Sequence, residues 1–278
     1  MARRSTNPLE RLTEPKRPAW LTPLQVVAAL SLLLALLYWG RGSTRALAAA
    51  KPKAQHCFFL IDRSGSMESL AEAVVDGVNG FVAKQAEMGE GMRLTLAQFH
   101  SGQPFELLIE EQEVTKVRPI KRRDFRPEGS TPLYDGIAEL LAYADRATRP
   151  DEAVVVIVFS DGQENASRKH SRDQVFRLVE EHKERGWTFV FMGANQDSYA
   201  AGIGNSKGAT MNIAATPAGV RAAFNDMESS NREMRKALKS GRTYTREERE
   251  NYIQSRSAEA MLTTQQQRKP QSVRGGAS

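Results

Sequence analysis

Five oxygen-bearing side chains in three segments have the chemistry of ligands for a hard cation: Asp62, Ser64, Ser66, Thr131 and Asp161. The first three alternate along one Gly-containing stretch, 62–66, and the last follows the most strongly β-branched run of the chain. Mg²⁺ prefers oxygen ligands in near-octahedral geometry and keeps several waters. Two carboxylates neutralise a divalent charge and the hydroxyls add none. We therefore predict a Mg²⁺ site with a position open to an outside anion.

Alternating strand and helix patterns indicate how these segments could meet. Continuous apolar runs predict strands at 56–61, 92–99, 105–109, 153–159, 188–192 and, weakly, 211–214. Amphipathic spacing predicts helices at 67–82, 133–146, 171–185 and 218–238. The polar stretch 110–129 is expected to be a loop or irregular. Buried strands alternating with helices are typical of an α/β doubly wound fold, a mostly parallel sheet with helices on both faces. Sites in such sheets form beyond the carboxyl ends of the strands, where all three segments fall.

The pattern Asp62-x-Ser64-x-Ser66, followed by Thr131 and Asp161, resembles the metal ion-dependent adhesion site of the von Willebrand factor type A (vWA) domain. The resemblance covers about residues 54–225 and includes Phe-Ser-Asp-Gly at 159–162. It implies a binding module rather than an enzyme. In that family the two serines and the threonine ligate Mg²⁺ or Mn²⁺, and the aspartates bind directly or through water. A protein partner often supplies an acidic side chain as the last ligand.

Other interpretations of the same residues remain open. Asp, Ser and Thr are also common helix caps and turn residues. The domain could instead be a scaffold or a subunit of a larger assembly, with the metal site secondary. A Mg²⁺-dependent phosphatase of haloacid-dehalogenase type also has an Asp after the first strand, but Ser64 stands where such enzymes carry a second Asp. The lone cysteine, Cys57, excludes a disulfide scaffold and is expected in the core.

A single transmembrane helix is predicted over residues 20–40, because Trp20 to Trp39 contains no charged residue. Twenty residues rising 1.5 Å each give about 30 Å of helix, enough to span a bilayer core. Five basic residues precede this stretch and four follow it, which weakly favours an extracytoplasmic vWA domain. A buried core helix, or a signal peptide cleaved after 46–48, is the alternative.

The net charge of +6 is unevenly distributed along the chain. Residues 1–54 carry nine basic and two acidic residues, residues 55–216 carry 18 and 24, and residues 217–278 carry 12 and seven. The body is therefore acidic, and no nucleic-acid partner is expected. One basic run, Lys121 to Arg126, could steer an acidic partner or could be a solvated loop.

These observations divide the chain into five parts: a basic N-terminal segment 1–19, the transmembrane helix 20–40, a linker 41–53, the vWA-like domain 54–238 and a polar C-terminal tail 239–278. The tail is expected to be partly helical or disordered, with Thr245 and Glu248 forming a capping box.

Overall fold

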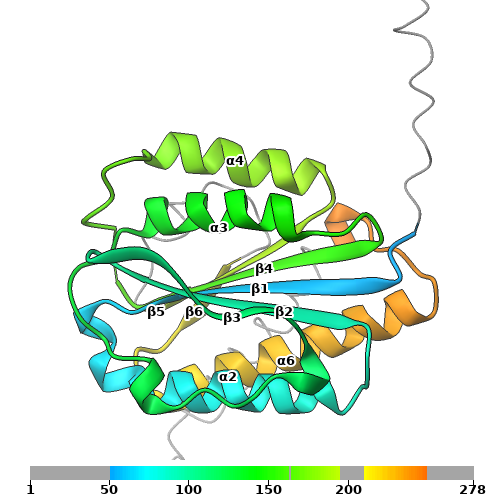
Figure 1. Cartoon of the computed structure of the whole chain (residues 1–278), viewed down its shortest axis with the longest axis horizontal. Coiled ribbons are helices and arrows are strands. Elements are labelled where there is room, and N and C mark those ends of the chain that lie inside the picture. The colour runs from blue at the N-terminus through cyan, green and yellow to red at the C-terminus, as the bar shows by residue number, and fades with distance from the viewer. Residues whose placement is uncertain (1–50, 163, 195–209, 249–278) are drawn as a thin grey trace, which may run out of the picture. The chain divides into compact units, whose positions relative to one another are not determined.

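The structure is a computed structural model, and residues 51–162, 164–194 and 210–248 are described below. A six-stranded sheet in the order β3-β2-β1-β4-β5-β6 forms its centre (Figure 1). The strands are β1 (Ala54–Asp62), β2 (Met92–His100), β3 (Gln103–Glu113), β4 (Glu152–Ser160), β5 (Thr188–Ala194) and β6 (Thr210–Ile213). Only β3 pairs antiparallel with its neighbour, so the predicted mostly parallel α/β sheet is confirmed.

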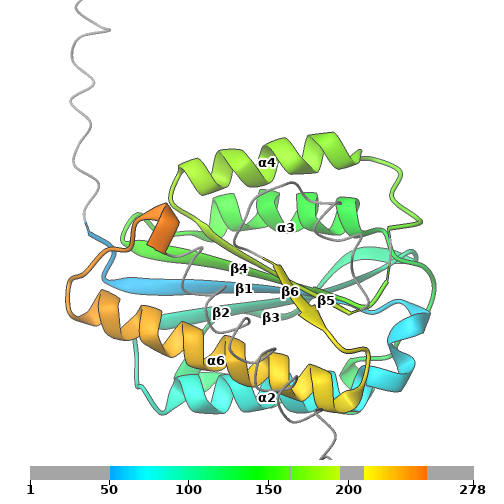
Figure 2. The ribbon, with the colours of Figure 1, turned by 180° about the vertical axis from the view of Figure 1, so that it is seen from behind.

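Helices cover both faces of the sheet. The main ones are α2 (Ala71–Ala86), α3 (Leu133–Ala147), α4 (Arg172–Glu184) and α6 (Pro217–Lys239). Figures 1 and 2 show α3 and α4 on one face and α2 and α6 on the other. Among the described residues, short 3₁₀ helices lie between β1 and α2, namely η1 (Gly65–Leu70), and between β3 and α3, namely η2 (Val114–Lys116) and η3 (Arg122–Asp124).

The central strand β1 shows why the strands read as continuous apolar runs. Phe59 and Ile61 pack into the core shared with α2 and α6, whereas Phe58 and Leu60 pack into the core shared with α3 and α4. Successive side chains of a strand point to opposite faces. Because both faces are covered, every position from Cys57 to Ile61 is apolar, and Cys57 is buried in this core as expected.

Two boundaries differ from the sequence prediction. The stretch expected to be a loop from residue 110 begins as strand, because β3 runs to Glu113, which lies opposite Arg93 of β2. β3 is an edge strand, where polar side chains can alternate toward solvent and hide the strand pattern. The helix expected from Met67 begins with η1 and becomes α-helical only at Ala71.

Reciprocal capping pairs occur at Ser171 and at Thr245. Ser171 accepts a hydrogen bond from the backbone of Gln174, whose side chain accepts one from Ser171 N, and this reciprocal pair opens α4. Thr245 and Glu248 form the same reciprocal pair, with distances of 3.0 and 3.1 Å. The predicted capping box at the start of the tail is thus confirmed.

The predicted transmembrane helix, residues 20–40, lies outside the described residues, as does the tail beyond residue 248. Within the described ranges, no helix combines the length and apolar character needed to cross a bilayer.

Candidate functional site

The first site segment leaves the sheet at the carboxyl end of β1, beside the end of β4. Parallel pairing places Ile61 opposite Phe159, so Asp62 and Ser160 follow as neighbours. The buried carboxylate of Asp62 accepts hydrogen bonds from Ser160 Oγ at 2.5 Å and from Ser64 N at 2.7 Å. One carboxylate therefore fixes both the end of β4 and the turn after β1.

A continuous row of oxygens runs from this turn to Asp161. The hydroxyls of Ser64 and Ser66 are 3.1 Å apart. Ser66 Oγ then donates to Asp161 Oδ1 at 2.7 Å. Ser64 is the extended N-cap residue of η1 and Ser66 lies in the first turn of η1, and this turn brings their hydroxyls together. Four of the five predicted site residues are thus joined by hydrogen bonds, Asp62 through the Ser64 backbone.

Thr131 comes from the segment before α3 and is nearly fully buried. Its backbone pairs with Asn165, which donates from its N–H to Thr131 O at 3.1 Å and accepts from Thr131 N through Oδ1 at 2.9 Å. The preceding Gly129 has a φ of +70° and accepts a bond from Gly65 N at 3.0 Å. This positive φ suits glycine and lets the second site segment lie against the first.

Gly162 marks the point where the side chains converge. A β-carbon added there would lie 3.1 Å from Thr131 Oγ1, 3.6 Å from Ser66 Oγ and 3.7 Å from Asp62 Oδ2. Three oxygens from two of the site segments therefore face one position beside the Gly162 backbone, which belongs to the third. The structure thus places all five predicted residues at one rim of the sheet.

Two acidic side chains hold the segment after Asp161 in place. Glu164 accepts bonds from Tyr134 N, Ala166 N and Ser167 N at 2.7–3.0 Å. Asp135, buried in the first turn of α3, accepts backbone bonds from residues 168, 169 and 170 at 2.8–3.0 Å. The only sequence signal for Asp135 is that it is an acidic residue in a first helical turn.

Burial makes the negative charge of the site costly. Desolvation raises the pKa of Asp62 to about 6, although hydrogen bonds from Ser160 and Ser64 oppose this rise. Desolvation also raises the pKa of Asp161, and the bond from Ser66 partly offsets it. Within the described residues, no group of three or more His, Cys, Asp and Glu side chains could hold a metal ion. Any cation here would therefore rely on hydroxyl ligands as well as on the two carboxylates.

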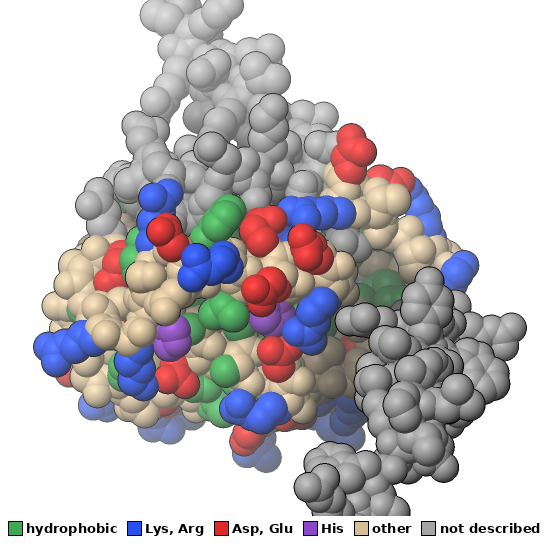
Figure 3. All heavy atoms as spheres, turned by 90° about the horizontal axis from the view of Figure 1, so that it is seen from above, with side chains coloured by type: hydrophobic (Ala, Val, Ile, Leu, Met, Phe, Trp, Pro, Cys, Tyr) green, Lys and Arg blue, Asp and Glu red, His purple; other side chains and the backbone are tan. Residues whose placement is uncertain are grey.

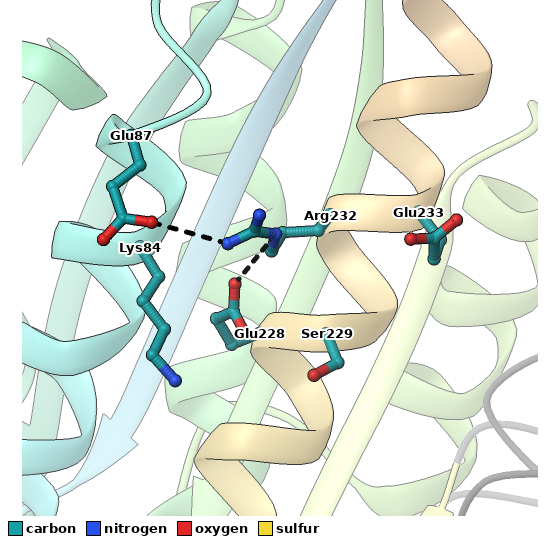
Figure 4. A pocket seen from close by; sticks show the side chains of 6 residues that line it. All are labelled: Lys84, Glu87, Glu228, Ser229, Arg232 and Glu233. Atoms are coloured by element: carbon teal, nitrogen blue, oxygen red, sulfur yellow. Dashed lines mark ion pairs between the residues drawn. The ribbon is translucent and has the colours of Figure 1, made fainter.

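A polar pocket of about 360 Å³ lies elsewhere, between α2 and α6 (Figure 4). Arg232 stands between two carboxylates in it, 3.6 Å from Glu87 and 3.5 Å from Glu228. The guanidinium group of Arg232 is therefore already paired, and none of the residues that line this pocket belongs to the three site segments.

Comparison with known structures supports the fold. Two structures of the pilus adhesin SpaC from Lactobacillus rhamnosus GG match with TM-scores of 0.51 and 0.52, at 18% and 17% identity. The matches cover 65% and 66% of this chain but only 30% of SpaC. Manganese-loaded TRAP protein of Plasmodium vivax matches at 18% identity with a TM-score of 0.41, over 62% of this chain and 73% of TRAP. Curated protein sequences give no match.

The family model of the von Willebrand factor type A domain matches residues 57–237, most of the chain. This range begins in β1 and ends in α6, and it includes all three site segments. The chain belongs to the von Willebrand factor type A domain family.

Proposed function

We propose that this domain binds Mg²⁺ or Mn²⁺ through Asp62, Ser64, Ser66, Thr131 and Asp161, and that it captures a protein partner there. Domains of this family are mostly binding modules rather than enzymes, which disfavours the phosphatase alternative. The observation that carries the proposal is the convergence of Thr131, Ser66 and Asp62 on the position beside Gly162.

The spacing of the oxygens fits the proposed ion. Neighbouring ligands of an octahedral Mg²⁺ at 2.0–2.1 Å lie roughly 2.9 Å apart. The Ser64–Ser66 and Ser66–Asp161 oxygen pairs are separated by 3.1 and 2.7 Å. Both pairs already have the spacing of adjacent ligand positions, and every donor is an oxygen.

The chain's own residues perform distinct tasks in this proposal. Asp62 and Asp161 supply negative charge, and because burial raises the pKa of both carboxyl groups, a bound cation would stabilise their ionised forms. Ser64, Ser66 and Thr131 supply neutral oxygens, so a bound ion would keep net positive charge. A bound divalent ion would act as a Lewis acid with affinity for an outside carboxylate. An acidic side chain of a protein partner is therefore the ligand we expect.

Isothermal titration of the full chain with MgCl₂ and MnCl₂ tests the metal site. We expect binding by the wild type and none by Asp62→Ala. Thr131→Ala should also lose binding although it removes no charge. The control is Asp76→Ala, which removes an exposed carboxylate from α2. Equal binding by wild type and Thr131→Ala would contradict the assignment.

Partner capture needs its own experiment. Proteins crosslinked to the wild-type chain in membranes should be recovered without chelator and lost both with EDTA and in Asp62→Ala. Capture that persists in EDTA would contradict a metal-dependent contact, even if the ion itself binds.

Membrane anchoring is proposed from the sequence of residues 20–40, with the vWA domain outside the cytoplasm. Alkaline carbonate extraction should leave the protein in the membrane pellet, and release into the supernatant would contradict a transmembrane helix. Protease added to sealed cells should digest the vWA domain; its protection would reverse the proposed orientation.

A further inference from the structure

Positive charge is concentrated on one short segment of the acidic body. Six of the 18 basic residues in 55–216 lie within residues 116–126, with one acidic residue among them. They are Lys116, Arg118, Lys121, Arg122, Arg123 and Arg126. This run, called the basic segment below, includes η3 and part of η2.

Much of this charge has no strong acidic partner. Arg122 pairs with Glu68 at 2.7 Å, but Arg123 is 3.8 Å from exposed Asp124. Within the described part of the chain, Lys121 and Arg126 form no ion pair. Exposed ion pairs are weak, and basic residues outnumber acidic ones here, so the segment keeps a net positive charge.

The basic segment is attached directly to the candidate metal loop. Arg63, which lies between Asp62 and Ser64, donates to Arg126 O at 2.8 Å. Its own carbonyl accepts a bond from Glu128 N at 2.9 Å. A partner seated at the metal site would therefore also face these arginines.

A pocket of about 470 Å³ lies under the basic segment, and its polar lining includes Arg63, Gln98, Glu106, Arg123 and Arg126. Arg63 and Gln98 are 8% and 2% exposed. Arg63 Nε and Gln98 Oε1 are buried without a hydrogen-bond partner. Glu106 Oε2 joins the two residues, accepting from Gln98 Nε2 at 2.8 Å and lying 3.5 Å from Arg63 Nη2.

These open atoms indicate the chemistry of an occupant. A buried donor or acceptor left without a hydrogen bond is unfavourable, so a ligand that pairs with it gains affinity. A peptide group carries both an acceptor and a donor, and can therefore complement Arg63 Nε and Gln98 Oε1. Carboxylates of the same peptide can pair with the exposed guanidinium groups of Arg123 and Arg126.

We propose that this pocket and the basic segment form a second contact site, beside the candidate metal site, for an acidic peptide segment of a protein partner. The site would select sequences with several acidic residues, of which one reaches the metal position. It extends the proposed function but does not depend on the metal, because none of its contacts uses the metal ligands' oxygens.

The lining favours a peptide over a nucleic acid or an anionic membrane. Glu106 and Asp124 stand among the arginines of the pocket, and Leu107, Leu108 and Ile120 complete its lining. Closely spaced phosphates would be repelled by these carboxylates, whereas a peptide offers amide and apolar groups as well as negative charge.

Fluorescence anisotropy of a labelled oligoglutamate peptide with the full chain, at low salt and in EDTA, tests the proposal. We expect the double variant Arg123→Ala/Arg126→Ala to bind about tenfold more weakly than wild type, because two exposed charge pairs with the peptide are lost. Glu106→Gln should bind more tightly, because it removes negative charge from the pocket.

The matched control is Arg146→Ala/Arg177→Ala, which removes the same charge from exposed positions on α3 and α4. The face over these helices carries interspersed acidic and basic side chains (Figure 3). Equal loss in this control, or no binding by wild type, would overturn the proposal. Tighter binding of oligodeoxythymidylate or of phosphatidylserine vesicles would also overturn it, in favour of those ligands. If the chain binds the peptide in EDTA but shows no binding of Mg²⁺ or Mn²⁺ by calorimetry, the metal site is contradicted and this second contact site is not.

Discussion

Replacing Asp62 by Asn should stabilise the metal-free protein while removing its metal site. Asp62 is completely buried, and desolvation raises its pKa from 3.8 to about 6. A difference of roughly two pKa units corresponds to about 3 kcal/mol, at 1.36 kcal/mol per unit. At pH 7.5 the carboxylate is ionised in both the folded and the unfolded state, so burying its charge lowers the free energy of unfolding by this amount.

The local geometry can accommodate the amide. Asn at position 62 keeps one oxygen to accept from Ser64 N, now at 2.7 Å. Its NH₂ can donate to Ser160 Oγ, whose hydrogen then turns toward Gly162 O, 3.2 Å away. No polar atom is left unpaired, so the gain in unfolding free energy should approach the full 3 kcal/mol. For a domain of this size, each kcal/mol shifts Tm by about 2–4 °C.

Calorimetric unfolding of the full chain in EDTA measures the effect, with the exposed Asp76→Asn as the control. The sign of the pH dependence follows from the raised pKa of Asp62. Between pH 6 and 4 the folded state binds a proton that the unfolded state lacks, so lowering the pH stabilises wild type relative to the variant and closes the gap. In excess MgCl₂ only the wild type should gain stability. A variant that is less stable than wild type in EDTA at pH 7.5, or a gap independent of pH, would refute the reasoning.

Two further predictions concern packing and a buried ion pair. Gly77→Ala should lower the free energy of unfolding by about 1–3 kcal/mol, because the new β-carbon would lie 2.3 Å from the ring of Phe224. Gly80→Ala is on the same helix, but its new β-carbon would have nothing within 4 Å. This variant should raise the free energy of unfolding by up to about 1 kcal/mol. Urea unfolding of both compares them directly, and equal changes would contradict this packing. Burial alone would raise the pKa of Glu152, but Arg93 binds it at 2.6 Å and lowers the pKa to about 2. Glu152→Gln should therefore cost about 3–5 kcal/mol at pH 7. The wild-type advantage should diminish below pH 4.5; an advantage that persists at pH 2 would contradict the pair.

Sequence patterns predicted the sheet and its helices because burial on two faces leaves a strong signal. The continuous apolar residues of β1 and β4 and the capping box at Thr245 are local features, which can be recognised without the fold. The rule that sites form beyond the carboxyl ends of parallel strands also predicted that the three site segments lie together. The extent of β3 could not be predicted, because an edge strand with the residues Glu110 to Glu113 has the composition of a loop.

The contacts that hold the site segments are non-local, and composition does not reveal them. Asp135 binds three backbone N–H groups more than thirty residues away in sequence. The pairing of Asn165 with Thr131 likewise joins two loops that meet only in the folded domain. Each residue, read locally, is an ordinary cap or loop residue. Their positioning role follows only from the folded domain, in which the segment before α3 and the segment after β4 meet at one rim.

These backbone bonds have a consequence for how the two proposed contact sites work together. Asp135, Glu164 and Asn165 fix the loops through main-chain atoms, and none of them is among the five proposed metal ligands. The rim is therefore held in place by the chain itself, and removing the ion should leave the loop positions nearly unchanged. The pocket under the basic segment, which is lined by Arg63, then keeps its shape in EDTA, so an acidic peptide can still bind there. Both contact sites lie on one rigid rim, so a single peptide that binds both loses its translational and rotational freedom only once. Its affinity should therefore exceed that of a peptide that binds only one of the two sites.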